Sequence, residues 1–589
     1  MEMLLSRKKA QDGIKTVLVA INAQYIHTGL GARSIYAYVK QETNISVILK
    51  EYTINDREAD VLENLYQCDA DVYLFSCYIW NIEMVLRLVR DLRQLRPDAR
   101  IGLGGPQIGY QGPAFLDMLP EVDWIFTGGE GEETCCQLLR LLAAGEPLTE
   151  CFGMVFRQEG QSVATARRQP VSLDRLAFAY PDIDELKHRT LYYESMRGCP
   201  YACSYCTSSI EHGVRKRSLP LVWGDLAVFM EHRVKQVKFV DRTFNCDAKH
   251  SRSIWEWLVM HDNGVTNFHF ELAGELLDEE TLAFLAGVRP GLFQFEIGVQ
   301  STNTETLKEI DRASNVPHLL ATVRKLLLPG NIHIHLDLIA GLPYEDLERF
   351  QQSFREVYAC APHQLQLGFL KVLSGSRMEQ KAGEYGLVYS QSAPYEVLCT
   401  RWIQYEELAL LRGIARMVDV YYNSARFSHT LRYLLAFFPD PFTFYRLLWL
   451  YYDSTTQRIP VSREGSFDLL ASFAKSRGIE ITEELQWLAK YDLLLHEKPR
   501  KLPTWITVDL TRKKRQHVQD FFKNEANIAA YLPEYSGEPS TQVERRAHLE
   551  IFPFEPSTGA PGAVAVVFNY RRRNLLGEAF AQSLPAEIL

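Results

Sequence analysis

The 589-residue sequence has no cysteine after Cys399, although it contains eleven cysteines in all. It also lacks an excess of positive charge, because 64 Lys and Arg residues stand against 73 Asp and Glu residues, for a net charge of −9. Nucleic-acid binding normally needs a basic face, so we expect no nucleic-acid partner. The missing thiols exclude a cysteine-bound iron–sulfur cluster from the last third of the chain.

Long hydrophobic runs are absent as well. The start of the chain, MEMLLSRKKAQDGIK, has no apolar core long enough for a secretory signal peptide. The most apolar late stretch, FYRLLWLYYDS, is too short to cross a bilayer and contains Arg446, so we interpret it as a buried helix. We therefore expect a cytoplasmic protein with no membrane span. In that reducing compartment, clustered cysteines bind metal or do redox chemistry more often than they form disulfides.

Three cysteines stand close together in the stretch MRGCPYACSYCTSS. Cys199, Cys203 and Cys206 follow a C-x3-C-x2-C spacing. A structural zinc ion needs a fourth Cys or His nearby, yet His188 and His212 keep no zinc-ligand spacing. A [4Fe–4S] cluster held by only three thiolates leaves one iron open to an outside ligand. The spacing favours such a cluster.

Strand and helix patterns alternate after the cysteine motif. The predicted strands are LYYESM, VKQVKFVD, TNFHFELAG, LFQFEIGVQS, IHIHLDLIAG and HQLQLGFLKV, with helical stretches such as EDLERFQQSFREVY between them. Six parallel βα units form an open, partial (β/α)6 barrel with its site at the carboxyl ends of the strands. Polar residues stand within or just after these strands: Asp241, Glu271, Glu296, Gln300, Ser301 and Asp337. Each serves either as a ligand contact or as a core hydrogen-bonding group.

Residues 188–378, with the cysteine motif after the first predicted strand, resemble the barrel of radical S-adenosylmethionine (SAM) enzymes. The resemblance implies that Cys199, Cys203 and Cys206 hold a [4Fe–4S] cluster whose free iron is chelated by SAM. It places further SAM contacts in the motifs FVDRTFN, EIGVQS and DLIAGLP. The residues expected to bind SAM are Tyr205, Asp241, Glu271, Gln300, Ser301, Ile339 and Gly341.

The first 150 residues form a second predicted α/β unit. Five short strands, KTVLVAIN, SVILKEYTIN, DVYLFSCYIW, RIGLGGPQ and VDWIFTGGEGEE, predict a doubly wound, Rossmann-like sheet with a ligand crevice beyond the strand ends. Glycines cluster at those ends, where they let the backbone approach a flat or bulky ligand. No G-x-G-x-x-G motif follows the first strand, which disfavours a dinucleotide.

A glycine-edged domain directly before such a barrel resembles the cobalamin-binding domain of cobalamin-dependent (class B) radical SAM enzymes. The resemblance rests on the loops NAQYIHTGLG, GGPQIGY and TGGEGEE. The residues it places around the corrin and its nucleotide tail are Tyr25, His27, Ser76, Tyr78, Gly104, Gly105, Gly128, Glu130 and Gly131. The D-x-H-x-x-G motif that supplies a cobalt-binding histidine in familiar cobalamin enzymes is absent, because no Asp stands two residues before His27. We therefore expect base-off cobalamin without a histidine ligand.

The remaining segments divide the chain into four parts. Residues 1–150 are the expected cobalamin-binding domain and residues 188–378 the radical SAM barrel. Between them, 151–187 are expected to form a hairpin and linker. Residues 379–589 have a helical, aromatic periodicity that ends in a predicted strand pair. This last part resembles an uncharacterised C-terminal domain that often accompanies such enzymes, and its role is unknown.

Together the resemblances imply a radical SAM enzyme with three cofactors: a [4Fe–4S] cluster, SAM and cobalamin. The expected reaction is methylation of an unactivated substrate carbon through a 5′-deoxyadenosyl radical and methylcobalamin, with flavodoxin or ferredoxin as reductant. No side chain is assigned as a catalytic acid or base. Two alternatives stay open: cyclisation or rearrangement without methyl transfer, and a non-catalytic cobalamin or cluster sensor.

Overall fold

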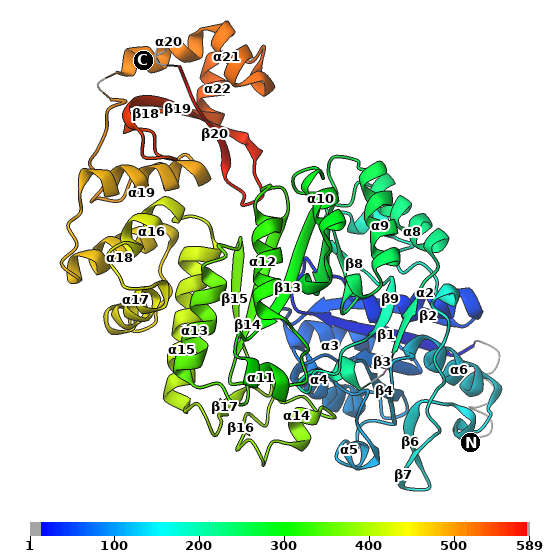
Figure 1. Cartoon of the computed structure of the whole chain (residues 1–589). Coiled ribbons are helices and arrows are strands. Elements are labelled where there is room, and N and C mark those ends of the chain that lie inside the picture. Colours follow the sequence, from blue (N-terminus) through cyan, green and yellow to red (C-terminus); the bar gives the residue numbers. More distant parts are fainter. Residues whose placement is uncertain (1–12, 211–212, 513, 586–589) are drawn as a thin grey trace.

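The computed structural model describes residues 13–210, 213–512 and 514–585. Residues 1–12 lie outside the described residues. They include most of the N-terminal stretch in which we expected no signal peptide. Figure 1 shows three parts in chain order: a blue to cyan N-terminal sheet, a green barrel and a yellow to red C-terminal part. No helix in the described part of the chain has the length and apolar character that a membrane crossing requires.

The N-terminal part is a seven-stranded sheet in the order β2-β1-β3-β4-β5-β6-β7. The first five strands are parallel, whereas β6 and β7 add the predicted hairpin antiparallel to the edge of the same sheet. Helices α2 and α6 pack on one face, and α3 and α4 pack on the other. This arrangement confirms the doubly wound fold. Its elements are β1 (Lys15–Asn22), α2 (Leu30–Glu42), β2 (Ser46–Thr53), α3 (Glu58–Gln67), β3 (Val72–Ser76), α4 (Ile82–Leu95), β4 (Arg100–Gly104), α5 (Pro113–Asp117), β5 (Trp124–Phe126), α6 (Gly131–Ala144), β6 (Met154–Gln158) and β7 (Gln161–Ala164).

The central part is a six-stranded parallel sheet in the order β15-β14-β13-β12-β11-β8. Apolar side chains such as Phe270 and Phe295 are buried in the core shared with the helices, and they alternate with polar side chains. The predicted six-stranded partial barrel is confirmed. Its elements are β8 (Thr190–Tyr193), α8 (Leu219–Glu231), β11 (Gln236–Phe239), α9 (Ala248–Met260), β12 (Asn267–Leu272), α10 (Glu279–Ala286), β13 (Phe293–Gln300), α11 (Thr304–Glu309), α12 (Val316–Leu327), β14 (His333–Ala340), α13 (Leu347–Tyr358) and β15 (Gln364–Phe369).

The cysteine loop carries a small strand pair that the sequence pattern did not predict. Strand β9 (Met196–Cys199) pairs antiparallel with β10 (Gly213–Lys216). Gly198 has φ of +101°, and a Cβ there would lie 2.1 Å from the carbonyl oxygen of Gly213. Only glycine fits this position, so the strand crossing next to Cys199 depends on it.

The C-terminal part is mainly helical and ends in a three-stranded antiparallel sheet, β18-β19-β20. The sequence predicted a strand pair there, and the structure adds the third strand. The apolar stretch FYRLLWLYYDS is part of α17, as the sequence predicted for a buried helix. Helix α17 packs against the barrel helix α13 and against α15 and α18. The elements are α15 (Tyr405–Met417), α16 (Ser428–Leu435), α17 (Pro441–Thr456), α18 (Arg463–Ser476), α19 (Glu483–His496), α20 (Arg515–Lys523), α21 (Glu525–Tyr531), α22 (Ser540–Arg546), β18 (Ala547–Phe554), β19 (Pro561–Arg573) and β20 (Ala579–Ser583).

Candidate functional site

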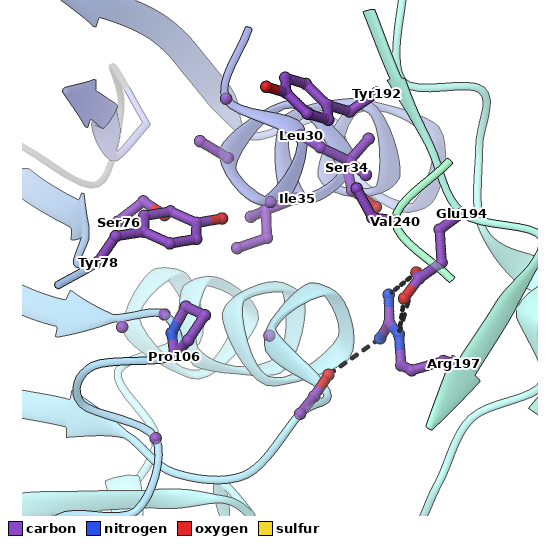
Figure 2. Close-up of a pocket in the computed structure, with 18 of the residues that line it drawn as sticks. Leu30, Ser34, Ile35, Ser76, Tyr78, Pro106, Tyr192, Glu194, Arg197 and Val240 are labelled. Atoms are coloured by element: carbon purple, nitrogen blue, oxygen red, sulfur yellow. Dashed lines mark hydrogen bonds and ion pairs between the residues drawn. The ribbon is translucent and has the colours of Figure 1, made fainter. Parts of the chain in front are cut away.

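A cavity of about 860 Å³ lies between the strand ends of the N-terminal sheet and the mouth of the barrel. Figure 2 shows Ser76, Tyr78 and Pro106 on one side of this space, and Tyr192 and Arg197 on the other. Its volume is in the range of cofactor and substrate sites. The two domains therefore enclose one ligand-sized space.

The N-terminal wall of the cavity is built from glycine-rich turns and an aromatic pair. Gly105 has φ of +96°, and a Cβ there would lie 2.6 Å from the carbonyl oxygen of Cys77, so this tight turn requires glycine. Tyr78 and Trp80 stack with their ring centroids 4.3 Å apart, and both line the cavity. A backbone turn without side chains beside flat rings suits a broad, planar ligand such as a corrin. Seven of the residues expected around cobalamin line this space: His27, Ser76, Tyr78, Gly104, Gly105, Gly128 and Gly131.

His27 is held by the barrel rather than by a carboxylate. Its Nδ1 lies 2.8 Å from the hydroxyl of Tyr192, and the neighbouring carbonyl of Ile26 accepts a hydrogen bond from Thr190 at 2.8 Å. Burial lowers the pKa of His27, and the charge of Lys238 lowers it further. The carboxylate that orients cobalt-binding or zinc-binding imidazoles in other proteins is replaced here by a neutral phenol.

Arg197 joins the two domains at the cavity wall, as Figure 2 shows. Its guanidinium donates to Glu132 of the N-terminal domain at 2.8 Å, to Glu194 at 2.7 Å and to the carbonyl of Gly129 at 2.9 Å. Burial alone would raise the pKa of Glu132, but the positive charge of Arg197 and the hydrogen bonds from Arg197 and Ser34 together lower it. Sequence reasoning missed this residue, because its partner carboxylate lies 65 positions away in another domain.

The three cysteines of the motif lie at the end of β9 and in the loop that follows it. Cys203 is buried, whereas Cys199 and Cys206 are half-buried. In the described part of the chain, their sulfur atoms do not gather within 4.8 Å of one another.

A second basic residue that sequence reasoning missed lies at this loop. Arg312 Nη1 is 4.0 Å from the sulfur of Cys203, and its Nη2 donates to the carbonyl of Gly298. No periodic signal marks Arg312, because it stands in the loop after α11. A fixed guanidinium beside a cysteine ligand would stabilise the negative charge of a thiolate-bound cluster.

Several residues expected to bind SAM face the loop or the inside of the barrel. Glu271 lines the cavity. Gln300 has φ of +68°, and its Oε1 is buried with no hydrogen-bond partner among the described residues. Tyr205 packs half-buried beside Cys203, and Ile339 is half-buried on β14. An unpartnered amide oxygen and a cavity-facing carboxylate fit a polar ligand such as SAM.

Asp241 has a different environment from the one expected. Its carboxylate accepts hydrogen bonds from the Ser195 amide at 2.8 Å, the Ser195 hydroxyl at 2.7 Å and the Met196 amide at 2.6 Å. Burial raises its pKa to about 8, against these hydrogen bonds. Asp241 therefore anchors the chain at the start of β9 instead of offering a free carboxylate to a ligand.

Like Asp241, Tyr205, Gln300 and Ile339, four further expected ligand residues lie outside the cavity lining. Ser301 donates to Glu345 at 2.6 Å, and Gly341 packs so closely that a Cβ would lie 2.6 Å from Val397. Glu130 is paired with Arg215, and it accepts a hydrogen bond from the amide of Val171 at 3.2 Å. Tyr25 is 63% exposed and stacks on His188. The short sequence motifs predicted which loops lie near the cavity. Which side chains of these loops point into the cavity depends on tertiary contacts.

Comparisons with known protein families divide the chain as the fold does. The description "B12 binding domain" matches residues 16–139, and "Radical SAM superfamily" matches residues 193–357. A "Protein of unknown function (DUF4080)" family matches residues 383–566. The radical SAM domain implies a [4Fe–4S] cluster and SAM, and the B12-binding domain implies cobalamin.

Two curated proteins illustrate the range of relatives. The cobalamin-dependent radical SAM methyltransferase TokK of Streptomyces tokunonensis is 24% identical over 419 residues, which cover 65% of this chain and 59% of that protein. The anaerobic magnesium-protoporphyrin IX monomethyl ester cyclase of Synechocystis sp. is 24% identical over 244 residues, which cover 39% of this chain and 48% of the cyclase. The chain therefore spans about half the length of the curated relatives it matches.

A solved structure supports the same fold. OxsB, a cobalamin-dependent SAM radical enzyme solved with aqua-cobalamin and SAM bound, superposes with a TM-score of 0.59 at 14% identity, over 80% of this chain and 76% of that one. The order of domains and the fold lead to one conclusion. The chain combines a domain that matches the B12-binding family, a domain that matches the radical SAM superfamily and a C-terminal domain of unknown function, and its fold is that of cobalamin-dependent radical SAM enzymes.

Proposed function

We propose that this chain is an enzyme that methylates an unactivated carbon of its substrate, using SAM, a [4Fe–4S] cluster and cobalamin. One observation carries the proposal: a single cavity is lined by glycine-rich loops of the B12-binding domain and by residues next to the cysteines. Gly105 and Gly128 contribute from the first domain, and Gly198 and Thr207 flank the cysteine motif on the barrel side. Two cofactors held by these loops would face the same substrate.

In this proposal Cys199, Cys203 and Cys206 hold the cluster. When bound, the cluster supplies the electron that releases a 5′-deoxyadenosyl radical from SAM, and cobalamin supplies the methyl group. Glu271 and Gln300 offer polar atoms to SAM from neighbouring strands. Arg312 balances the charge of the cluster beside Cys203.

The N-terminal residues orient cobalamin and close the cavity. Tyr78 and the turns at Gly104 and Gly105 form the wall against which the corrin would lie. His27 Nδ1 lies 2.8 Å from the hydroxyl of Tyr192, and without a carboxylate partner at this nitrogen His27 would not serve as a cobalt ligand. Arg197 holds the two domains together, which keeps water away from a reactive radical.

The reduced cluster needs a low-potential electron donor, and we propose flavodoxin or ferredoxin in the cytoplasm. Mass spectrometry of the products of the anaerobically reconstituted enzyme tests the function. With candidate peptides, lipids and small metabolites, we expect 5′-deoxyadenosine together with a product heavier by one methyl group. The variant with Cys199, Cys203 and Cys206 all changed to Ala should form neither product.

Radical cyclisation or rearrangement without methyl transfer is the second candidate. The match to a magnesium-protoporphyrin ester cyclase favours it, since that relative's name describes a cyclase. SAM with a deuterated methyl group separates the two reactions, because only methylation transfers the label to the product. Formation of 5′-deoxyadenosine in either case would exclude a purely sensory role.

A further inference from the structure

The inside of the barrel carries a layer of charged and imidazole side chains, two of which, Lys238 and Glu271, also line the cavity. Because successive residues of a strand face opposite sides, the polar residues between buried Phe and Leu positions on β12 to β14 all point into the lumen. Glu296 pairs in register with Glu271 on one neighbouring strand and with His335 on the other. The layer consists of Lys238, His269, Glu271, Glu296, His335 and Asp337.

Three of these residues bring ligand atoms together. One ligand atom each from Glu296, His335 and Asp337 lies within 4.8 Å of the other two. His335 Nε2 is 3.0 Å from Asp337 Oδ1, and His269 Nε2 is 3.2 Å from Glu296 Oε2. The cluster therefore presents two carboxylates and one imidazole around one point, with a second imidazole beside Glu296, and these are donor types of many transition-metal sites.

The two imidazoles are buried and face carboxylates. The side chains of His269 and His335 are only 9% and 7% exposed. Each Nε2 atom lies beside a carboxylate oxygen, that of Glu296 for His269 and that of Asp337 for His335. Buried imidazole nitrogens and carboxylate oxygens at such distances are the ligand types that bind transition metals.

The charged side chains of the layer also favour a bound cation. Lys238 is the one ammonium of the layer, with Nζ 3.1 Å from Glu296 and 3.7 Å from Glu271. The charge of Arg242 also acts on Glu271, so Glu271 has counter-charges of its own. Glu296 and Asp337 bring two carboxylates to the ligand cluster. When both are ionised, their two negative charges would match a divalent cation.

We propose that Glu296, His335 and Asp337, with His269 as a fourth ligand, bind a divalent transition-metal ion of the Zn²⁺, Fe²⁺ or Mn²⁺ class. Metal–nitrogen and metal–oxygen bonds of about 2.1 Å place neighbouring ligand atoms about 3.4 Å apart, close to the distances found here. The side chains of Glu296 and Asp337 remain 24% and 18% exposed, so the ion keeps access to water or a substrate group from the lumen. The site is separate from the cysteine loop and goes beyond the proposed function.

Metal binding at this site should be measured with an ion other than iron or cobalt, because the cluster contains iron and cobalamin contains cobalt. We would load the full-length holoenzyme with Mn²⁺, whose paramagnetic resonance is distinct from iron and cobalt, and measure bound ion after dialysis. We expect about one Mn²⁺ per chain. Asp337→Asn and His335→Ala should each weaken binding about tenfold or more, whereas His318→Ala, an exposed histidine on α12, should leave it unchanged.

A substitution of Lys238 provides a second test, because a misfolded variant would not bind the ion more tightly. Its ammonium lies beside Glu296, so it repels a cation at the cluster. Lys238→Met should therefore bind Mn²⁺ about tenfold more tightly. The proposal fails if no stoichiometric Mn²⁺ or Zn²⁺ binds, or if binding persists unchanged in Asp337→Asn and His335→Ala. It fails equally if Lys238→Met leaves the affinity as it was, because the ion would then lie elsewhere.

Discussion

Replacing Arg197 with Met removes the guanidinium that joins the B12-binding domain to the barrel. Glu132, whose side chain is 8% exposed, then keeps the 2.8 Å hydrogen bond from the Ser34 hydroxyl but has lost its ion pair with Arg197. Breaking a buried ion pair by removing one partner costs about 3–5 kcal/mol, because the other charge stays buried and uncompensated. For a unit of 150–250 residues, this lowers the unfolding midpoint by about 6–20 °C.

The assay is differential scanning calorimetry of full-length protein, with hydrogen exchange across α6 to locate the weakened region. Glu132→Gln in the Arg197→Met background should restore part of the loss, because it removes the buried charge. Arg87→Met is the matched control: Arg87 and Glu58 form a pair whose side chains are 51% and 42% exposed, and its loss should cost about 1 kcal/mol or less. Equal effects for Arg197→Met and Arg87→Met, or no rescue by Glu132→Gln, would refute the reasoning.

Three further predictions concern the cofactor loops and one buried acid. Anaerobic reconstitution should give about four irons per chain, and changing Cys199, Cys203 and Cys206 to Ala should abolish the iron and SAM cleavage; about eight irons would contradict a single cluster. Paramagnetic resonance of bound cob(II)alamin should show no three-line nitrogen splitting, and a splitting that disappears in His27→Ala would mean that His27 binds cobalt. Burial raises the pKa of Glu345 to about 7, so the folded state keeps a proton that the unfolded state loses above pH 4.5. Stability should therefore fall by up to about 3 kcal/mol between these pH values, and urea unfolding of Glu345→Gln should show a flatter dependence.

The fold followed from local patterns in the sequence, whereas the cofactor loops were expected only from the resemblance to a family. Alternating strands and helices predict both α/β units because hydrophobic periodicity is a local property of the chain. The hairpin at residues 154–164 was also predicted, since a short turn separates its two strands. Gly198 and Gly105 stand where positive φ and close backbone contacts demand glycine.

Side-chain partners across domains and strands could not be predicted in the same way. Arg197 and Glu132 meet only after two separately folded domains pack together. Asp241 lies in the expected motif, yet its carboxylate turns toward Ser195, because buried amides there need an acceptor. Glu296 and Asp337 were recognisable as polar residues of buried strands, but the approach of Glu296 to His335 depends on the register between β13 and β14.

The central claim is that cobalamin and the [4Fe–4S] cluster face one cavity between the two domains. It can be tested without knowing the substrate, by recording the cob(II)alamin resonance of the holoenzyme before and after reduction of the cluster. Two paramagnetic centres in one cavity should couple, so we predict dipolar broadening of the cobalt signal that appears on reduction and is absent when Cys199, Cys203 and Cys206 are changed to Ala. A cobalt signal that stays the same when the cluster is reduced would contradict the shared cavity.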